Sequence, residues 1–136
     1  ALHACDTATD DALLRAVGWE AELVLAAPCC HHDISAQLRK GPTPVGWTSL
    51  TRDGILRERL ADTLTDALRA AILRQVGYRV DVVEFVESVH TPRNTLLRAV
   101  RTGSAPSRQA HDEYDALVST WHLQPQLAEL LERGDP

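Results

Sequence analysis

The segment Glu22-Leu-Val-Leu-Ala-Ala-Pro28 decides the fold class of this chain. After its glutamate it is a continuous apolar run of strand length, a pattern typical of a parallel strand covered on both faces. Upstream, apolar residues recur at helical spacing from Thr7 to Val17, and Gly18 follows them. We therefore expect a helix that leads directly into a buried strand.

Downstream of this strand, a second helix and strand follow. Leucine and isoleucine repeat every fourth residue between Asp53 and Val76, which predicts the longest helix of the chain. Gly77 supplies a C-terminal cap, and the Val-rich segment from Tyr78 to Val86 predicts a strand. The intervening segment 39–52 contains glycines and prolines without a clear period, so we expect a surface loop or lid there.

The remaining third of the chain is less uniform. Residues 91–103 suit either a helix or a strand, whereas residues 107–122 are helical in pattern and Pro125 opens a last amphipathic stretch. Alternating strands and helices predict an α/β sheet with right-handed crossovers. In such sheets ligands bind beyond the carboxyl ends of the strands. We therefore expect Cys5–Asp10, Cys29–His32 and His90–Asn94 to meet at one edge.

The composition narrows the function classes. The chain has 136 residues, 44% of them apolar, and a formal net charge of -5, which gives no support to a generally basic nucleic-acid-binding surface. No apolar run approaches the roughly 20 residues that cross a bilayer, so we expect a soluble, cytoplasmic protein without membrane contact. The three cysteines are an odd number and two are adjacent, which favours reduced thiols over a disulfide framework.

The polar residues at the predicted edge allow several interpretations. Asp6, Thr9 and Asp10 suit helix capping as well as a functional site. His31 or His32 suits a general base near neutral pH, oriented by Asp6 or Asp10, or a histidine that only binds backbone. Cys29 and His31 with His3 and Cys5 would make a zinc set, but the local spacings of zinc sites are missing, so we predict no metal. A cysteine nucleophile with a histidine base also remains open.

Two strings, His3 to Asp10 (HACDTATD) and Pro28 to His32 (PCCHH), together carry a family resemblance. They resemble a group of class I S-adenosylmethionine-dependent methyltransferases that includes bacterial methyltransferase-domain proteins and tRNA 2′-O-methyltransferases. Asp6 stands where glycine is usual in the tRNA enzymes.

The resemblance implies an α/β fold, the C-terminal part of a Rossmann-like class I sheet with strands four to seven and their helices. The first three strands would be absent, and with them the glycine-rich cofactor loop. Residues 1–103 would form the C-terminal half of the methyltransferase domain, and residues 104–136 a helical extension on the same domain. It also favours a strand over residues 95–101, antiparallel to its neighbours.

The same resemblance implies a site for S-adenosylmethionine in the full-length protein. The implied cofactor-binding residues are His3, Ala4, Cys5 and Asp6. The implied catalytic residues are Asp6, His31 and His32, and the implied substrate-binding residues are Thr9, Asp10, Cys29, Cys30, Arg93 and Asn94.

The implied partners are the missing N-terminal half of the domain and an RNA or small-molecule methyl acceptor. Alone, this chain would be inactive and would dimerise or aggregate through the open edge around Ala1 to Ala4. The alternative is a non-catalytic binding or metal-holding domain that uses the Cys/His edge.

Overall fold

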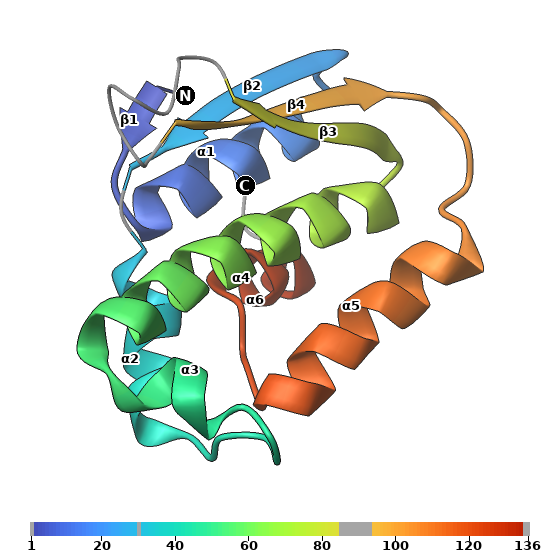
Figure 1. The fold of residues 1–136 in the computed structure, drawn as a ribbon. Coiled ribbons are helices and arrows are strands. Elements are labelled where there is room, and N and C mark those ends of the chain that lie inside the picture. The colour runs from blue at the N-terminus through green and yellow to red at the C-terminus, as the bar shows by residue number, and fades with distance from the viewer. Residues whose placement is uncertain (1, 30, 85–93, 135–136) are drawn as a thin grey trace.

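The computed structural model describes residues 2–29, 31–84 and 94–134, which form a small α/β structure (Figure 1). Its sheet has the order β1-β2-β4-β3. The strands are β1 (Leu2–Ala4), β2 (Leu23–Pro28), β3 (Tyr78–Glu84) and β4 (Thr95–Arg101). β1 runs parallel to β2, and β4 runs antiparallel to both β2 and β3. The expected α/β class and the antiparallel strand over residues 95–101 are thus confirmed.

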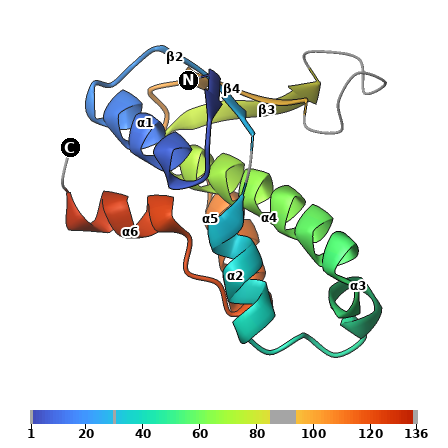
Figure 2. The ribbon, with the colours of Figure 1, turned by 90° about the vertical axis from the view of Figure 1, so that its left-hand side faces the viewer.

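The helices all lie on one side of this sheet, as Figures 1 and 2 show. They are α1 (Thr7–Gly18), α2 (His32–Lys40), α3 (Thr48–Arg52), α4 (Gly54–Gln75), α5 (Arg108–Trp121) and α6 (Gln126–Arg133). The predicted helices at α1, α4 and α5 are confirmed to within two residues. Helix α2 was not predicted, and the expected loop at 39–52 contains the short helix α3.

The prediction that β2 is covered on both faces is wrong for the part of the chain described. Val24 and Ala26 are buried against the helices, but Leu23 and Leu25 are 56% and 42% exposed. Their side chains point to the opposite face of the sheet because side chains alternate along a strand. No described helix covers that face.

Two apolar cores meet at α4. One lies between the sheet, α1, α4 and α6, and contains Leu13, Leu73, Leu97 and Leu127, each at most 1% exposed. The other packs α2 and α5 on α4 and contains Ile34, Leu38, Leu64, Leu68 and Trp121. Helix α4 contributes residues to both cores. Side chains on more than one side of its second half are therefore buried.

Local sequence signals account for the ends of several elements. Gly77 takes a φ of 93° between α4 and β3, a conformation that favours glycine. Ser107 caps α5, since its hydroxyl accepts a hydrogen bond of 3.2 Å from the Ala110 amide. Strand β3 therefore follows α4 through the glycine turn that the sequence predicted.

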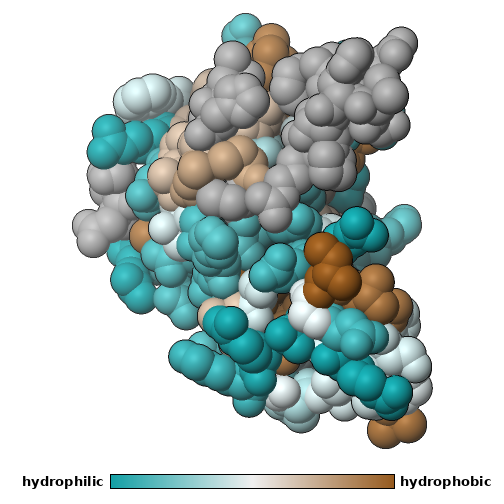
Figure 3. Space-filling model, turned by 60° about the vertical axis from the view of Figure 1, so that its left-hand side comes forward, coloured by the Kyte–Doolittle hydropathy of each residue, from teal (hydrophilic) through white to brown (hydrophobic). Residues whose placement is uncertain are grey.

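The surface in Figure 3 is mainly hydrophilic, with a few apolar residues gathered in small groups. Among the described helices, none combines the length and apolarity needed to span a membrane.

Candidate functional site

The sheet register brings together the described parts of the predicted edge segments, whereas residues 90–93 lie outside the described residues. Ala4 is paired with Pro28, Ala26 with Leu97, and Glu84 with Thr95. The residues that follow β1 and β2, and the residue that precedes β4, therefore lie along one edge of the sheet. Cys5 and Cys29 meet there, with their sulfur atoms 3.1 Å apart.

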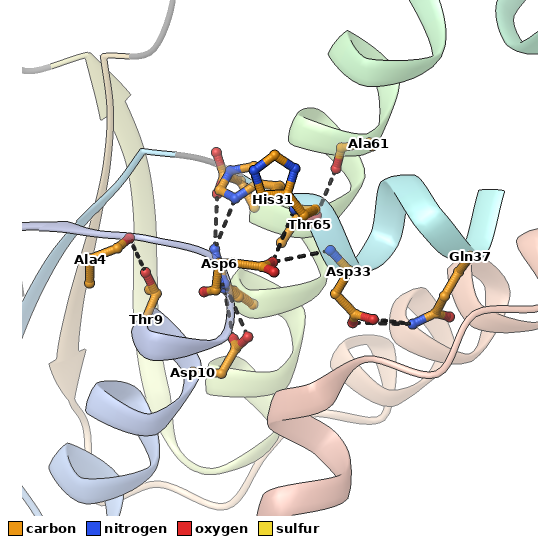
Figure 4. A network of polar contacts seen from close by, with 12 residues as sticks. Ala4, Asp6, Thr9, Asp10, His31, Asp33, Gln37, Ala61 and Thr65 are labelled. Atoms are coloured by element: carbon orange, nitrogen blue, oxygen red, sulfur yellow. Dashed lines mark hydrogen bonds and ion pairs between the residues drawn. The ribbon is translucent and has the colours of Figure 1, made fainter. Parts of the chain in front are cut away.

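Asp6 joins two turns at this edge. Its carboxylate Oδ1 accepts hydrogen bonds from the backbone amides of His32 (3.0 Å) and Asp33 (3.1 Å), at the start of α2. His31, the residue before α2, makes no side-chain cap of its own. Asp6 thus caps a helix that begins 26 residues later, and Figure 4 shows its side chain directed toward Asp33.

Asp6 holds this position in a strained backbone conformation, with φ 48° and ψ -125°. This region is sparsely populated by residues other than glycine and costs on the order of 1–3 kcal/mol. The strain gives a physical reason why glycine suits this position. In this chain the carboxylate offsets the strain by capping α2.

We expect Asp6→Gly to leave the free energy of unfolding within about 1 kcal/mol of the original, because relief of backbone strain offsets loss of the cap. Asp6→Ala loses the cap and keeps the strain, so it should be less stable by about 1–2 kcal/mol. Urea denaturation of the two variants measures the difference. An alanine variant as stable as the glycine variant would contradict the strained conformation.

Arg69, in the middle of α4, is the centre of the polar network behind the edge. It is 2% exposed, and its Nε and Nη2 donate to the two carboxylate oxygens of Asp10 at 2.8 and 3.0 Å. Nη2 also donates to the backbone carbonyl of Asp6 at 2.8 Å. This bidentate contact is the geometry that guanidinium and carboxylate groups favour. Arg69 therefore ties the β1–α1 turn to α4.

His31 is held on the other side of Arg69 and is 6% exposed. Its Nδ1 lies 3.4 Å from Nη1 of Arg69, which is always a donor, so Nδ1 acts as the acceptor. The ring proton of the neutral histidine then sits on Nε2, 3.2 Å from Oδ1 of Asp66. That oxygen is buried and has no well-directed hydrogen bond from any described residue, so its contact with His31 is chiefly electrostatic.

The pKa of Asp10 is raised above its ordinary value of 3.8, chiefly because burial disfavours the charged form, although Arg69 lowers it in part. The folded state then holds this proton to higher pH than the unfolded state. The contribution of Asp10 to stability is therefore present below pH 3.8 and is lost as pH rises through the raised value. A carbon-13 NMR titration of the Asp10 carboxyl should give a midpoint above 3.8. A midpoint below it would contradict the dominance of burial.

The predicted site residues fall into two groups. Thr9 and Asp10 are buried behind the edge. Thr9 is 1% exposed and its hydroxyl donates to the Ala4 carbonyl at 2.8 Å, and Asp10 is paired with Arg69. The described residues at the edge itself are Cys5, Asp6, Cys29, His31, His32 and Asn94. Among them His31 and Asn94 are buried, whereas Cys5 and His32 are exposed. Cys30 and Arg93 lie outside the described residues.

The expectation that Asp6 or Asp10 orients a histidine is not met for His31, whose ring nitrogens lie against Asp66 and Arg69 of α4. For His32 it stays a prediction. The sequence predicted this helix from its apolar repeat, and none of its residues was expected at the site. The available signal was an acid and a base three residues apart in a stretch, Leu64 to Ile72, that is otherwise almost wholly apolar or small. Charged residues are rarely buried unless they are paired.

A cleft of about 520 Å³ opens beside His31. Cys29 and His31 line it from the end of β2, Thr95 lines it from β4, and the first half of α4 forms the opposite wall. That wall carries Glu58, Arg59, Asp62 and Asp66. The cleft thus joins the Cys/His segment to a mainly acidic surface.

Within the described residues, no group of three or more histidine, cysteine, aspartate or glutamate side chains could hold a metal ion. Both ring nitrogens of His31 already face Arg69 and Asp66. His31 therefore does not present a ligand to the zinc set considered from the sequence.

Comparison with known proteins gives one informative match. The model of a family described as "Methyltransferase domain" matches residues 1–37. No curated protein and no solved structure matches the chain significantly. The matched residues run from β1 to the middle of α2 and contain both edge segments that Asp6 joins. The match supports a methyltransferase domain in this part of the chain.

Proposed function

We propose that this chain is part of an S-adenosylmethionine-dependent methyltransferase, with the transfer site at the edge formed by Cys5, Asp6, Cys29 and His31. The observation that carries the proposal is the contact of Asp6 with the start of α2. It joins the two motif segments into one local structure within the region that matches the methyltransferase family.

The strand arrangement supports the same proposal. A parallel pair, β1 and β2, is followed by the antiparallel strand β4 inserted between β2 and β3. This is the hairpin expected for the last strands of a class I sheet. The open edge of β1 and the exposed face around Leu23 and Leu25 fit a further part of the domain that covers both in the whole protein.

The residues at the edge fit one end of the cofactor. Both capping hydrogen bonds of Asp6 go to Oδ1, so Oδ2 has no hydrogen bond to any described residue and suits an ammonium group such as that of the methionine part. When bound, S-adenosylmethionine supplies an electrophilic methyl group on a sulfonium. We assign the backbone and side chains of Cys5 and Asp6 to the cofactor side of the site.

The histidines take different roles in this proposal. His31 is buried with both ring nitrogens engaged, so we assign it to positioning the turn beside the cleft. His32 is exposed, so its ring can exchange a proton with a methyl acceptor or with water. A general base is needed only where the group that receives the methyl carries a proton that it must lose.

The charge of the cleft favours a small or cationic methyl acceptor over RNA. Of the described residues that line the cleft, three are carboxylates, Glu58, Asp62 and Asp66, and one is an arginine, Arg59. Phosphates are bound by lysine and arginine clusters, which this wall lacks. RNA methylation is therefore the less favoured outcome of an acceptor screen.

Calorimetric titration with S-adenosylmethionine tests the proposal on the longest natural chain that contains these residues. We expect binding by that protein and none by residues 1–136 alone, which contain no glycine-rich cofactor loop. Absence of binding by the longest chain would contradict the proposal and favour the non-catalytic alternative.

The role of His32 is tested by methyl transfer to the acceptor that the screen identifies. We expect His32→Ala to lower kcat by about 10²-fold or more where the acceptor must lose a proton. His111→Ala, a change at an exposed histidine of α5, is the matched control and should leave kcat unchanged. Equal activities of the two variants would remove His32 from the transfer step.

A further inference from the structure

We propose that Cys5 and Cys29 form a reversible disulfide that locks the two site turns together. The two thiols come from segments 24 residues apart, yet their sulfur atoms lie 3.1 Å from each other. A disulfide bond is about 2.05 Å long, so a relative movement of about 1 Å brings the sulfurs to bonding distance.

The backbone geometry suits this bond. The residues immediately before the two cysteines, Ala4 and Pro28, are partners in the parallel β1–β2 pair. Neighbouring strands lie about 4.8 Å apart, which falls within the Cα separation of about 4.4–6.8 Å found in disulfides. Pairing of Ala4 with Pro28 therefore places the backbones that lead into the two cysteines at a spacing that a disulfide allows.

Exposure determines which thiol reacts first. Cys5 is exposed and Cys29 is half-buried, so Cys5 is the thiol open to an oxidant. A low-molecular-weight disulfide such as oxidised glutathione is attacked by the Cys5 thiolate, which forms a mixed disulfide and releases one glutathione thiolate. The Cys29 thiolate then attacks the Cys5 sulfur and displaces the second glutathione. In balance, two protein thiols are oxidised and one glutathione disulfide is reduced to two thiols.

The position of the pair gives the bond a consequence for the site. Cys5 directly precedes Asp6, whose carboxylate caps α2, and Cys29 lies two residues before His31 at the mouth of the cleft. A bond between them fixes the spacing of the two turns. The modification thus lies at the proposed transfer site, but its formation does not depend on the proposed function.

Peptide mapping by mass spectrometry, after equilibration of the full-length protein with oxidised glutathione, tests the proposal. We expect a cross-linked peptide pair that joins Cys5 to Cys29 and disappears on reduction. Cys30→Ser is the matched control, because it removes the neighbouring thiol and should retain the cross-link. Cys5→Ser and Cys29→Ser should each abolish it.

The intermediate gives a second measurement. Cys29→Ser lacks the resolving thiol, so glutathione should accumulate on Cys5 in that variant. A Cys30→Ser protein that forms only mixed disulfides, or an original protein that links Cys5 to Cys30, would overturn the proposal. Methyl-transfer assays test the proposed function. Their result does not change which cysteines are cross-linked in the peptide map.

Discussion

Replacement of Arg69 by methionine is expected to lower the free energy of unfolding by about 3–5 kcal/mol, the usual cost of removing one partner of a buried ion pair. Arg69 is 2% exposed and donates to both oxygens of Asp10 and to the Asp6 carbonyl. Methionine fills similar space without a donor. The variant therefore leaves a buried carboxylate at Asp10 without its cation.

Urea denaturation of the chain measures this loss, and two further variants define its origin. Arg59→Met, on the exposed part of the same helix, should change stability by no more than about 0.5 kcal/mol. The double variant Arg69→Met, Asp10→Leu should recover part of the loss, because it removes the stranded charge as well. A loss below about 1 kcal/mol for Arg69→Met would show that water or another group reaches Asp10.

The elements that the sequence predicted well are those specified by local patterns. Helix α4 follows from a four-residue apolar repeat, and its end follows from Gly77, which takes the positive φ that the turn requires. Residues 95–101 could be assigned to a strand only through the family resemblance. Their own pattern suits a helix as well, and pairing with β2 and β3 decides the outcome.

The elements that the sequence missed depend on distant partners. Helix α2 has nine residues, and its cap is Asp6, which lies outside the local window that a capping signal occupies. Likewise, the partner of Arg69 is Asp10, 59 residues away. A single sequence shows both charges but not their contact. The edge itself could be predicted, because the carboxyl ends of parallel strands coincide by topology.

Trp121→Ala is expected to lower the free energy of unfolding by about 3–5 kcal/mol, the typical cost of truncating a buried tryptophan. Trp121 ends α5, is 5% exposed, and packs in the core that α5 shares with α2 and α4. Its ring also meets Trp47 edge-on, with centroids 5.3 Å apart. The truncation thus removes contacts from three segments at once.

This variant tests whether residues 104–136 fold with the rest of the chain. Trp19→Ala is the matched control, since Trp19 is 77% exposed and its removal should change stability by no more than about 0.5 kcal/mol. If α5 is an integral part of the core, Trp121→Ala must shift the single unfolding transition of the whole chain, followed by far-UV circular dichroism. A variant that unfolds at the original urea concentration would show that α5 contributes no stability, and would separate residues 104–136 from the domain. If residues 104–136 pack on the same domain, Trp121→Ala must therefore lower the free energy of unfolding far more than Trp19→Ala does.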